Sequence, residues 1–410
     1  MNACPYDAIY INPETNTAHK CNFCNHRIDQ GLEPSCVIVC PTQAIKVGDL
    51  DDPASEVSRI VARDDVAVRA PEQNTKPKVF YRGADQASLD PTRTTIAADG
   101  LIWSETTAAH PRLPDGYDDA AVVARTAYAT GAHPLTWAAK VSGYLVTKAI
   151  AAGTMLVAAL LVLLGHADVQ ATVGVVPPLI AGTFLAVTGV LLVADLKQPA
   201  RFHYLLTRGN PTSWLVKGAW ILMAYAVATG IWWIGGLAGS GSLVEIMAAP
   251  TAVLAAATAG YTAYLFAQCE GRDLWQSPLL LPMLLAQAAA AGGAVYTLVD
   301  VVADVPESEA AVWVLLGGVL ASLALVLVEV TAHGTRQVEL AVHDMVAGAQ
   351  KGRFRIGIVV GMLVPAALAV VALAADTSTL VPALAGLCAL VGMWFYEDAY
   401  VRAGQSVPLS

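Results

Sequence analysis

The chain has 410 residues, of which 56% are hydrophobic and only 14% are charged, and its formal net charge at pH 7 is −9. This composition excludes an ordinary soluble protein. The acidic balance and the lack of a basic stripe interleaved with aromatic residues argue against nucleic acid as a partner. The hydrophobic residues are unevenly spread, because the chain is polar up to about residue 135 and strongly apolar beyond it.

Most of the cysteines lie near the start of the chain with the spacing of metal ligands. Cys21 and Cys24 are followed by Cys36 and by Cys40, which precedes Pro41. Three clustered cysteines and a Cys-Pro form the spacing that binds a [4Fe-4S] cluster, and soft thiolates suit iron. A structural zinc site is the alternative, although such sites usually have two Cys-x2-Cys pairs. The spacing therefore favours an iron–sulfur cluster.

A second Cys-Pro, formed by Cys4 and Pro5, indicates a further cluster motif. The cysteine before the proline usually ligates a different cluster from its neighbours, so these motifs occur in pairs. The third cysteine of this motif would fall before Met1. We therefore expect the missing cysteines to lie upstream or on another polypeptide. Cys269 and Cys388 lie within or at the end of apolar runs, and we interpret them as plain hydrophobic residues.

The N-terminal part divides into two regions by composition. Residues 1–50 predict a partial ferredoxin-like [4Fe-4S] module made of short loops and turns. Residues 51–135 are rich in Asp, Pro, Ala and Thr with little periodicity. They predict an extended connector, with a disordered linker as the alternative. Its best strand-like piece is Val79-Phe80-Tyr81.

The remainder, 136–410, is predicted to be a membrane domain. Its apolar runs are each long enough to cross a bilayer core of about 30 Å at about 20 residues per helix. The predicted fold class is a mainly α membrane protein, an eight-transmembrane-helix bundle preceded by a partial ferredoxin-like iron–sulfur module. Pro177, Pro178 and Pro365 interrupt two runs, which a helix bundle tolerates. The predicted spans are 141–165, 171–194, 213–236, 248–268, 277–299, 311–332, 356–375 and 378–397.

Charge in the loops predicts the orientation of this bundle. With eight spans, both ends of the domain lie on one face, and the loops of that face carry Lys197, Arg201, Arg208, Lys217, Arg272, Arg336, Lys351, Arg353, Arg355 and Arg402. The loops of the other face lack Lys and Arg and carry Asp168, Glu245, Asp300, Asp304, Glu307 and Glu309. The positive-inside rule then places both termini and the cluster module in the cytoplasm.

Polar residues inside apolar spans are costly and so are functional candidates. Nearly all of them fall in the half of the bundle nearer the cluster module: Lys148, Asp195, Tyr261, Tyr264, Glu329, His333, Glu397 and Asp398, with Gln287 midway along its span. Structural roles are the alternative for several of them. Lys148 can snorkel to the interface, Tyr261 and Tyr264 can belong to an aromatic belt, and Asp195 can pair with Arg201.

Such residues suit a site for a quinone. A quinone needs an apolar slot, hydrogen-bond donors to its two carbonyl oxygens and a nearby proton carrier. Tyr and Lys can donate, and Asp195 or Glu329 can carry protons. None of the eight histidines lies in the middle of a span, so the sequence offers no pair of axial ligands for a haem in the bundle.

At this point the sequence resembles two known families. The stretch ACPYDAIYINPETNTAHKCNFCNHRIDQGLEPSCVIVCPTQAI resembles the last half of the four-cluster ferredoxin subunits of complex iron–sulfur molybdoenzymes. The membrane part resembles the NrfD/polysulfide-reductase anchor family in ADLKQPARFHYLL at 194–206, NPTSWLVKGAW at 210–220, YTAYL at 261–265, LWQSPLLLP at 274–282 and YVRAGQSVPLS at 400–410. The resemblance implies a quinol-binding anchor fused to its electron-transfer subunit, with a separate catalytic subunit that usually carries molybdopterin.

The resemblance also implies roles for the cysteines. Cys21, Cys24 and Cys36 would hold one [4Fe-4S] cluster whose fourth ligand is absent from this chain. Cys40 and Cys4 would each complete a cluster whose other ligands are absent. The cofactors implied are therefore [4Fe-4S] clusters with incomplete ligand sets in this chain, together with menaquinone or ubiquinone.

For the quinone, the resemblance implies polar groups of the first and fourth spans, which correspond to Tyr144 or Lys148 and to Tyr261. The candidate quinone and proton site comprises Tyr144, Lys148, Asp195, Arg201, Tyr261 and Glu329. Lys197 and Gln198 depart from the family, which more often has Gly-Arg there.

Two functions are consistent with the sequence. The first is a non-catalytic subunit that passes electrons between the iron–sulfur clusters of a molybdopterin oxidoreductase complex and the quinone pool of a bacterial or archaeal cell membrane. The second is a membrane transporter or assembly anchor with a structural, metal-binding cysteine appendage. A transporter would favour polar breaks near the bilayer midplane, whereas the polar residues here gather toward one face. The sequence therefore favours electron transfer.

Overall fold

The fold is described from a computed structural model. It describes residues 6, 8–12, 17–84, 89, 137–165, 171–196, 199–269, 272–303, 308–332, 334–375 and 377–407. The chain divides into two compact units, Met1–Thr136 and Trp137–Ser410.

The first unit begins with a small antiparallel hairpin and two short helices. Strand β1 (Tyr10–Asn12) pairs with β2 (Thr17–His19), so that Tyr10 lies opposite His19. Helix α1 (Asn25–Ile28) starts directly after Cys24, and α2 (Ser35–Ile38) contains Cys36. These elements are too short to bury much apolar surface, and in α1 no residue is buried.

Within the predicted connector, the described residues contain regular structure, most of which the sequence did not indicate. Helix α3 (Glu56–Arg63) is followed by β3 (Val66–Ala67), the 3-10 helix η1 (Pro71–Gln73) and β4 (Tyr81–Arg82), which pairs with β3. Asp64 ties the end of α3 to β4 through Arg63 at 2.7 Å and Arg82 at 2.9 Å. The strand-like Val79-Phe80-Tyr81 overlaps β4 by one residue. The rest of the connector, 85–135 apart from residue 89, lies outside the described residues.

The second unit is a bundle of long apolar helices. Its described residues contain eight helices that are long and apolar enough to cross a membrane, which confirms the predicted number. They are α6 (Ala139–Leu163), α8 (Val176–Asp195), α10 (Trp214–Leu237), α11 (Gly241–Ala267), α12 (Leu280–Val299), α13 (Ser308–Thr331), a composite span (Lys351–Ala374) and α17 (Leu380–Ser406).

The composite span changes its helical type along its length. It consists of α15 (Lys351–Ile358), the π-helical segment η5 (Val359–Leu363) and α16 (Val364–Ala374). Pro365 explains the change, because proline has no N–H to donate to the carbonyl four residues earlier and its ring crowds that carbonyl. A local π turn relieves the crowding without ending the helix.

Helices α11 and α17 extend furthest beyond their predicted bounds. Helix α11 begins at Gly241 rather than at 248 and runs straight through Pro250, since neighbouring helices re-satisfy the backbone around a proline in a bundle. Helix α17 continues to Ser406, past the predicted end at 397, and Glu397 and Asp398 are buried in its interior. Hydropathy could not find that last part, because its polar residues are covered by protein.

Shorter elements connect the spans. On the side where α6 begins they are η3 (Pro199–Arg201), α9 (Tyr204–Thr207), η4 (Asp273–Gln276) and α14 (Arg336–Val346), and α7 (Ala171–Gly174) precedes α8.

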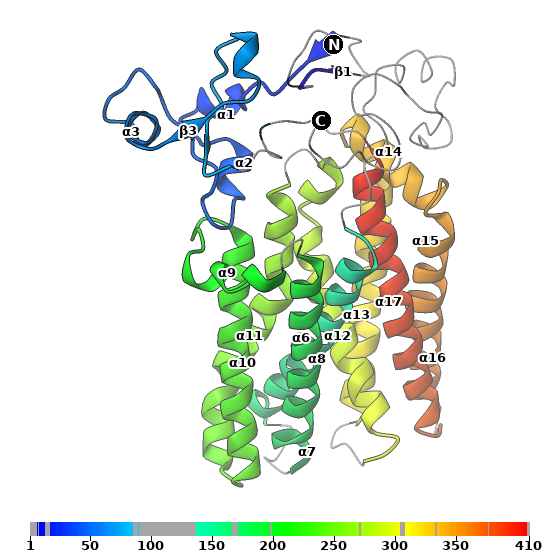
Figure 1. Cartoon of the computed structure of the whole chain (residues 1–410). Helices are drawn as coiled ribbons and strands as arrows, with labels where there is room; N and C mark the ends of the chain where they lie inside the picture. Colours follow the sequence, from blue (N-terminus) through cyan, green and yellow to red (C-terminus); the bar gives the residue numbers. More distant parts are fainter. Residues whose placement is uncertain are drawn as a thin grey trace. The chain divides into compact units, whose positions relative to one another are not determined.

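Helix α6 lies at the centre of the bundle. It packs against α8, α11, α12 and α17, and most of its residues are buried. Figure 1 shows the long helices running side by side around it. Small residues allow close approach: a Cβ atom added at Gly153 would lie only 2.7 Å from the backbone nitrogen of Gly292 in α12. Close backbone packing of this kind holds helices together where lipid removes the hydrophobic driving force.

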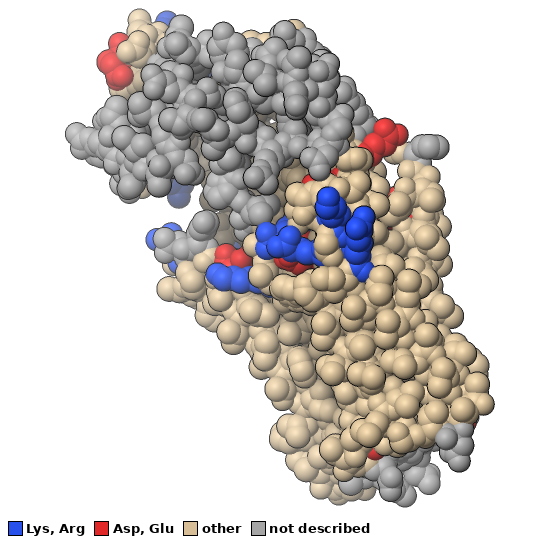
Figure 2. All heavy atoms as spheres, turned by 90° about the vertical axis from the view of Figure 1, so that its right-hand side faces the viewer, with Lys and Arg blue, Asp and Glu red and all other residues tan. Residues whose placement is uncertain are grey.

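The surface of the bundle is charged mainly at one end. On the face shown in Figure 2, lysine and arginine side chains gather at one level, and a broad, nearly uncharged band of surface follows. That band is what a helix bundle exposes to lipid acyl chains. The orientation of the bundle relative to the cytoplasm stays a prediction from loop charge.

Candidate functional site

Among the described residues of the spans, four acidic or basic side chains are buried: Lys148, Glu329, Glu397 and Asp398, each at most 8% exposed. All four were singled out as polar residues in the sequence. Burying charge inside a membrane bundle costs free energy, so each requires compensation from neighbours or a functional use. Their surroundings differ, and they form three separate polar groups.

The first group is centred on Lys148, which α6 places next to α11. The Nζ atom of Lys148 donates a hydrogen bond to the Oγ1 atom of Thr262. It also lies 4.8 Å from the ring centroid of Tyr261 and 6.0 Å from that of Tyr144. Lys148 is 1% exposed, so its side chain does not snorkel to the interface. The structure thus brings together three of the predicted site residues, Tyr144, Lys148 and Tyr261.

The position of Tyr261 depends on a glycine in a third helix. A Cβ atom at Gly218 of α10 would lie 2.6 Å from the Cδ2 atom of the Tyr261 ring, so only glycine leaves room for the ring there. Tyr264, one turn further along α11, is 43% exposed and stacks on Trp214 with ring centroids 4.3 Å apart. Of the two tyrosines predicted as either site or belt residues, Tyr261 is therefore buried and Tyr264 lies on the outer surface.

Carboxylates flank this group on two sides. Glu397 of α17 is buried and attracts the Lys148 ammonium electrostatically. Gln287 of α12 is 4% exposed and neighbours Glu397. Asp195, the last residue of α8, is close enough to act electrostatically on Tyr144. Cationic, phenolic and carboxylate groups are thus combined in this part of the bundle, where Lys148, Tyr261 and Glu397 are buried.

The second group surrounds Glu329 near the end of α13. Its Oε2 atom accepts a hydrogen bond of 2.6 Å from the Oγ atom of Ser277. Glu329 also interacts electrostatically with Tyr396 and Tyr400 of α17, and Glu397 interacts with the same two tyrosines. Glu329 is therefore linked to the first group through α17 rather than by direct contact. Arg201, also predicted for the site, is exposed at the end of η3.

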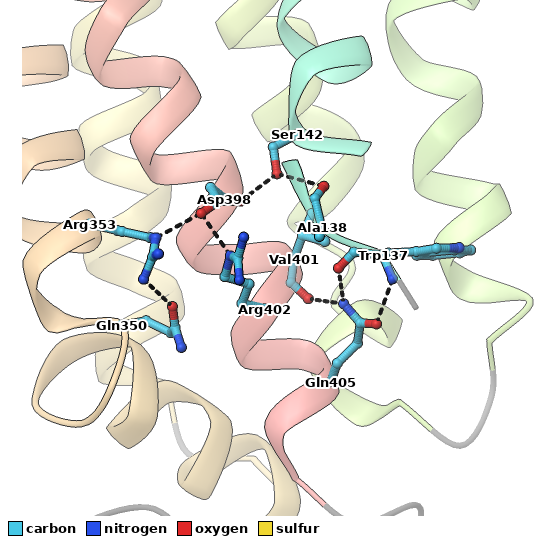
Figure 3. Close-up of polar contacts among 9 residues, drawn as sticks. All are labelled: Trp137, Ala138, Ser142, Gln350, Arg353, Asp398, Val401, Arg402 and Gln405. Atoms are coloured by element: carbon cyan, nitrogen blue, oxygen red, sulfur yellow. Dashed lines mark hydrogen bonds and ion pairs between the residues drawn. The ribbon is translucent and has the colours of Figure 1, made fainter. Parts of the chain in front are cut away.

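The third group is centred on Asp398 and joins three helices (Figure 3). One carboxylate oxygen, Oδ2, binds the Nε atoms of Arg353 at 2.7 Å and Arg402 at 2.8 Å. The other, Oδ1, accepts a hydrogen bond of 3.1 Å from the Oγ atom of Ser142. Arg353 is further held by the Oε1 atom of Gln350 at 3.1 Å. The group fixes α6 and α15 to α17.

The start of the second unit is held by the end of α17. The Gln405 side chain accepts from the Trp137 backbone N–H at 3.0 Å and donates to the Trp137 carbonyl at 2.7 Å, as Figure 3 shows. The Trp137 ring stacks on Trp275 and on Phe266, with centroids 4.9 and 5.3 Å apart. These contacts fix where the chain enters α6, and so the height of Lys148 in the bundle.

Sequence reasoning missed several of these partners. Thr262 was not singled out because threonine is common in apolar helices and its role appears only through contact with Lys148, which lies far away in the sequence. Arg402 offered a readable signal, since it follows Asp398 by four residues on one helix. Arg353 offered none, because nothing in the sequence places α15 beside α17.

The described cysteines of the first unit are not gathered around one point. Among the described residues, which leave out Cys4, no three His, Cys, Asp or Glu side chains are placed so that they could hold a metal. Cys21 and Cys36 are exposed, whereas Cys40 is buried and its Sγ atom accepts the Ala44 N–H at 3.1 Å. The thiols of Cys21, Cys24, Cys36 and Cys40 suit iron by their chemistry. Hydrogen bonds from backbone N–H groups to cysteine sulfur are typical of iron–sulfur sites.

The two other cysteines lie in the second unit. Cys269, directly after α11, is partly buried, and burial raises the pKa of its thiol to about 11. A thiol of that pKa stays protonated at neutral pH and is a poor ligand and nucleophile. Cys388 lies within α17 and is also partly buried.

Comparison with known families agrees with this architecture. The family model described as polysulphide reductase, NrfD, matches residues 129–407. The model described as a 4Fe-4S dicluster domain matches residues 1–50. The two matches confirm the resemblance seen in the sequence: an iron–sulfur module precedes a multi-pass membrane domain on one chain.

Curated relatives match parts of the chain. A tetrathionate reductase subunit of Salmonella typhimurium is 44% identical over 107 residues, which are 26% of this chain and 42% of that protein. A polysulfide reductase component of Wolinella succinogenes is 44% identical over 79 residues, 19% of this chain and 41% of that protein. The arsenate respiratory reductase iron-sulfur subunit ArrB of Shewanella sp. is 49% identical over 65 residues, 16% of this chain and 28% of that protein. The chain thus spans about two fifths of the first two relatives.

Proposed function

This chain belongs to the polysulphide reductase NrfD family, and from that premise we propose that it passes electrons between iron–sulfur clusters and the membrane quinone pool. Its partner in this proposal is a catalytic oxidoreductase subunit that carries molybdopterin. The names of the relatives support a place in a reductase complex, since they are components of tetrathionate, polysulfide and arsenate reductases. The chain itself would be the electron-transfer and quinone-reactive part.

The observation that carries the quinone proposal is the group formed by Lys148, Tyr144 and Tyr261. A quinone presents two carbonyl oxygens that accept hydrogen bonds, on a flat apolar ring. An ammonium and two phenols are the donors that recognise such oxygens. Because all three side chains are at most 4% exposed, their hydrogen bonds act in a low-dielectric setting, where they are stronger than in water.

Protons would be handled by the carboxylates around this group. A bound quinone supplies two-electron, two-proton chemistry, and a bound cluster supplies single electrons. The chain must therefore take up or release protons beside the donors. Glu397 can take up a proton on its carboxylate, and Lys148 balances the negative charge that remains when the proton leaves. Asp195 can take up a proton near Tyr144 at the end of α8. General acid–base transfer needs such a group within reach of the reacting oxygen.

The clusters would be ligated by the N-terminal cysteines. We assign Cys21, Cys24 and Cys36 to one [4Fe-4S] cluster, and Cys40 and Cys4 to clusters completed from elsewhere. The match of residues 1–50 to a 4Fe-4S dicluster domain supports iron and sulfur rather than zinc. Since the described cysteines do not converge by themselves, this proposal requires further ligands to draw the loops together.

The transporter alternative has less support. A transporter binds its substrate near the bilayer midplane between paired repeats. Here the buried acidic and basic residues of the spans lie within about two and a half turns of the helix ends on the side where α6 begins. Charged residues of the opposite side, such as Glu245 and Glu309, are exposed.

The test compares two tyrosines of the same helix in the complete membrane complex. Tyr261→Phe removes a buried hydroxyl of the proposed site, whereas Tyr264→Phe removes an exposed one and serves as the matched control. We expect Tyr261→Phe to slow quinol turnover about tenfold or more, because a lost hydrogen bond in a water-excluded site costs about 1–3 kcal/mol. The iron and sulfide content and the cluster EPR signals should stay unchanged in both variants.

Equal turnover in wild type, Tyr261→Phe and Tyr264→Phe would remove Tyr261 from the site. Lys148→Gln provides an independent check, since it removes the cation but keeps a hydrogen-bond donor. If Lys148→Gln also leaves turnover and quinone-analogue binding unchanged, the quinone proposal for this group is wrong. Stoichiometric zinc in place of iron would refute the cluster assignment.

A further inference from the structure

The start of the composite span carries a cluster of basic residues that the proposed electron-transfer site does not use. Lys351, Arg353 and Arg355 lie within the first five residues of the span, and Arg353 shares Asp398 with Arg402 of α17. Two carboxylate residues, Asp344 and Asp398, neighbour this segment, so positive charge is in excess. Figure 2 shows lysine and arginine side chains gathered on this part of the bundle surface.

Much of this positive charge has no partner within the described part of the protein. Lys351 and Arg355 are exposed and make no ion pair or hydrogen bond through their side chains among the described residues. Within the same residues, Arg402 uses only its Nε atom, on Asp398, which leaves its two terminal amino groups available. Arg353 is 40% exposed even though it contacts Asp398 and Gln350. Asp398 therefore holds two guanidinium groups in place without neutralising both.

An apolar stripe continues from these cations along the same helix. Lys351, Arg355, Val359 and Leu363 follow one another at intervals of four residues, which places them on one helix face. Val359 and Leu363 are each 47% exposed. Two exposed cations followed by two exposed aliphatic residues match a molecule with an anionic head and an apolar tail. The cations mark the end of a membrane span, which is the level of lipid headgroups.

We propose that this surface binds an anionic phospholipid, with the phosphate held by Lys351 and Arg355 and an acyl chain along Val359 and Leu363. Guanidinium groups recognise phosphate oxygens through paired N–H donors. Basic pockets near the ends of spans bind the headgroups of anionic lipids. The Asp398 group holds α15, the helix that carries both cations, against α17 and α6.

The test measures lipid selectivity in nanodiscs, using spin-labelled phosphatidylglycerol against spin-labelled phosphatidylcholine on the full chain. Wild type should prefer phosphatidylglycerol. Lys351→Gln combined with Arg355→Gln should weaken that preference about thirtyfold, the equivalent of about 2 kcal/mol at about 1 kcal/mol for each basic residue. Arg208→Gln combined with Lys217→Gln removes the same charge from the same end of the bundle and should leave the preference unchanged.

Two further measurements keep the outcome decisive. Lys351→Arg combined with Arg355→Lys keeps the charge and should retain the preference, which separates lipid binding from misfolding. Equal selectivity in wild type and in the Lys351/Arg355 glutamine variant would overturn the proposal. So would an unchanged lipid preference accompanied by loss of a co-purifying subunit, because the surface would then bind a protein. Quinol turnover is followed separately, since this proposal does not depend on the quinone site.

Discussion

Replacing Asp398 by Asn tests whether the Asp398 group stabilises the membrane unit. The substitution keeps the size of the side chain and an acceptor oxygen for Ser142, but it removes the negative charge that faces Arg353 and Arg402. Asp398 is 1% exposed, so neither water nor a salt ion can take the place of its negative charge after the substitution. The two guanidinium groups would then repel each other without a counter-charge between them.

The size of the effect follows from the exposure of the partners. A broken buried ion pair costs about 3–5 kcal/mol, whereas an exposed pair contributes at most about 1 kcal/mol. The side chains of Arg353 and Arg402 are 40% and 19% exposed, so both can regain water when the carboxylate is lost. We therefore expect Asp398→Asn to lower the free energy of unfolding by about 2 kcal/mol. Asp398→Ala should cost about 1 kcal/mol more, because Ser142 also loses its acceptor.

The assay is a denaturant titration of the purified protein in micelles, followed by tryptophan fluorescence and checked for refolding. Glu245→Gln is the matched control, since it removes an exposed carboxylate of the same bundle. Glu245→Gln should leave the unfolding free energy unchanged. Our reasoning is wrong, and the Asp398 group does not stabilise the bundle, if Asp398→Asn is as stable as wild type. The same holds if Asp398→Asn and Glu245→Gln lower the free energy of unfolding equally.

Two other predictions concern packing and thiol chemistry. Gly153→Ala should lower the free energy of unfolding by about 3 kcal/mol, because the new Cβ would lie 2.9 Å from the carbonyl carbon of Ala288. The control is Gly182→Ala, whose new Cβ would meet nothing within 4 Å and which should be neutral or slightly stabilising. Equal unfolding midpoints for the two variants would contradict this packing. Cys269 should react with iodoacetamide at pH 8 about a hundredfold more slowly than an ordinary thiol, because burial raises its pKa from 9.0 to about 11, which leaves less thiolate to react. Its labelling, measured by mass spectrometry, should rise as the pH approaches 11, and fast labelling at pH 8 would show that Cys269 is not buried as described.

The site was only partly readable from the sequence. Lys148, Glu329, Glu397 and Asp398 could be recognised because an ionisable residue is conspicuous in an apolar run. Their grouping could not be recognised, since Thr262 and Lys148 meet only when α6 packs on α11. Tyr261 and Tyr264 also could not be told apart. In a membrane bundle both the lipid-facing and the inward-facing sides of a helix are apolar, so no hydrophobic periodicity marks which residue is buried.

The sequence by itself determined the number and order of the spans, because each helix must bury about 20 apolar residues in a bilayer of fixed thickness. It also favoured an iron–sulfur module over zinc, because the spacing of Cys21, Cys24, Cys36 and Cys40 limits which metal centre a short loop can bind. Only the tertiary structure decided which polar residues meet. Hydrogen bonds and ion pairs such as Asp398 with Arg353 form over a few ångströms between distant parts of the chain, and that distance is set by helix packing rather than by composition.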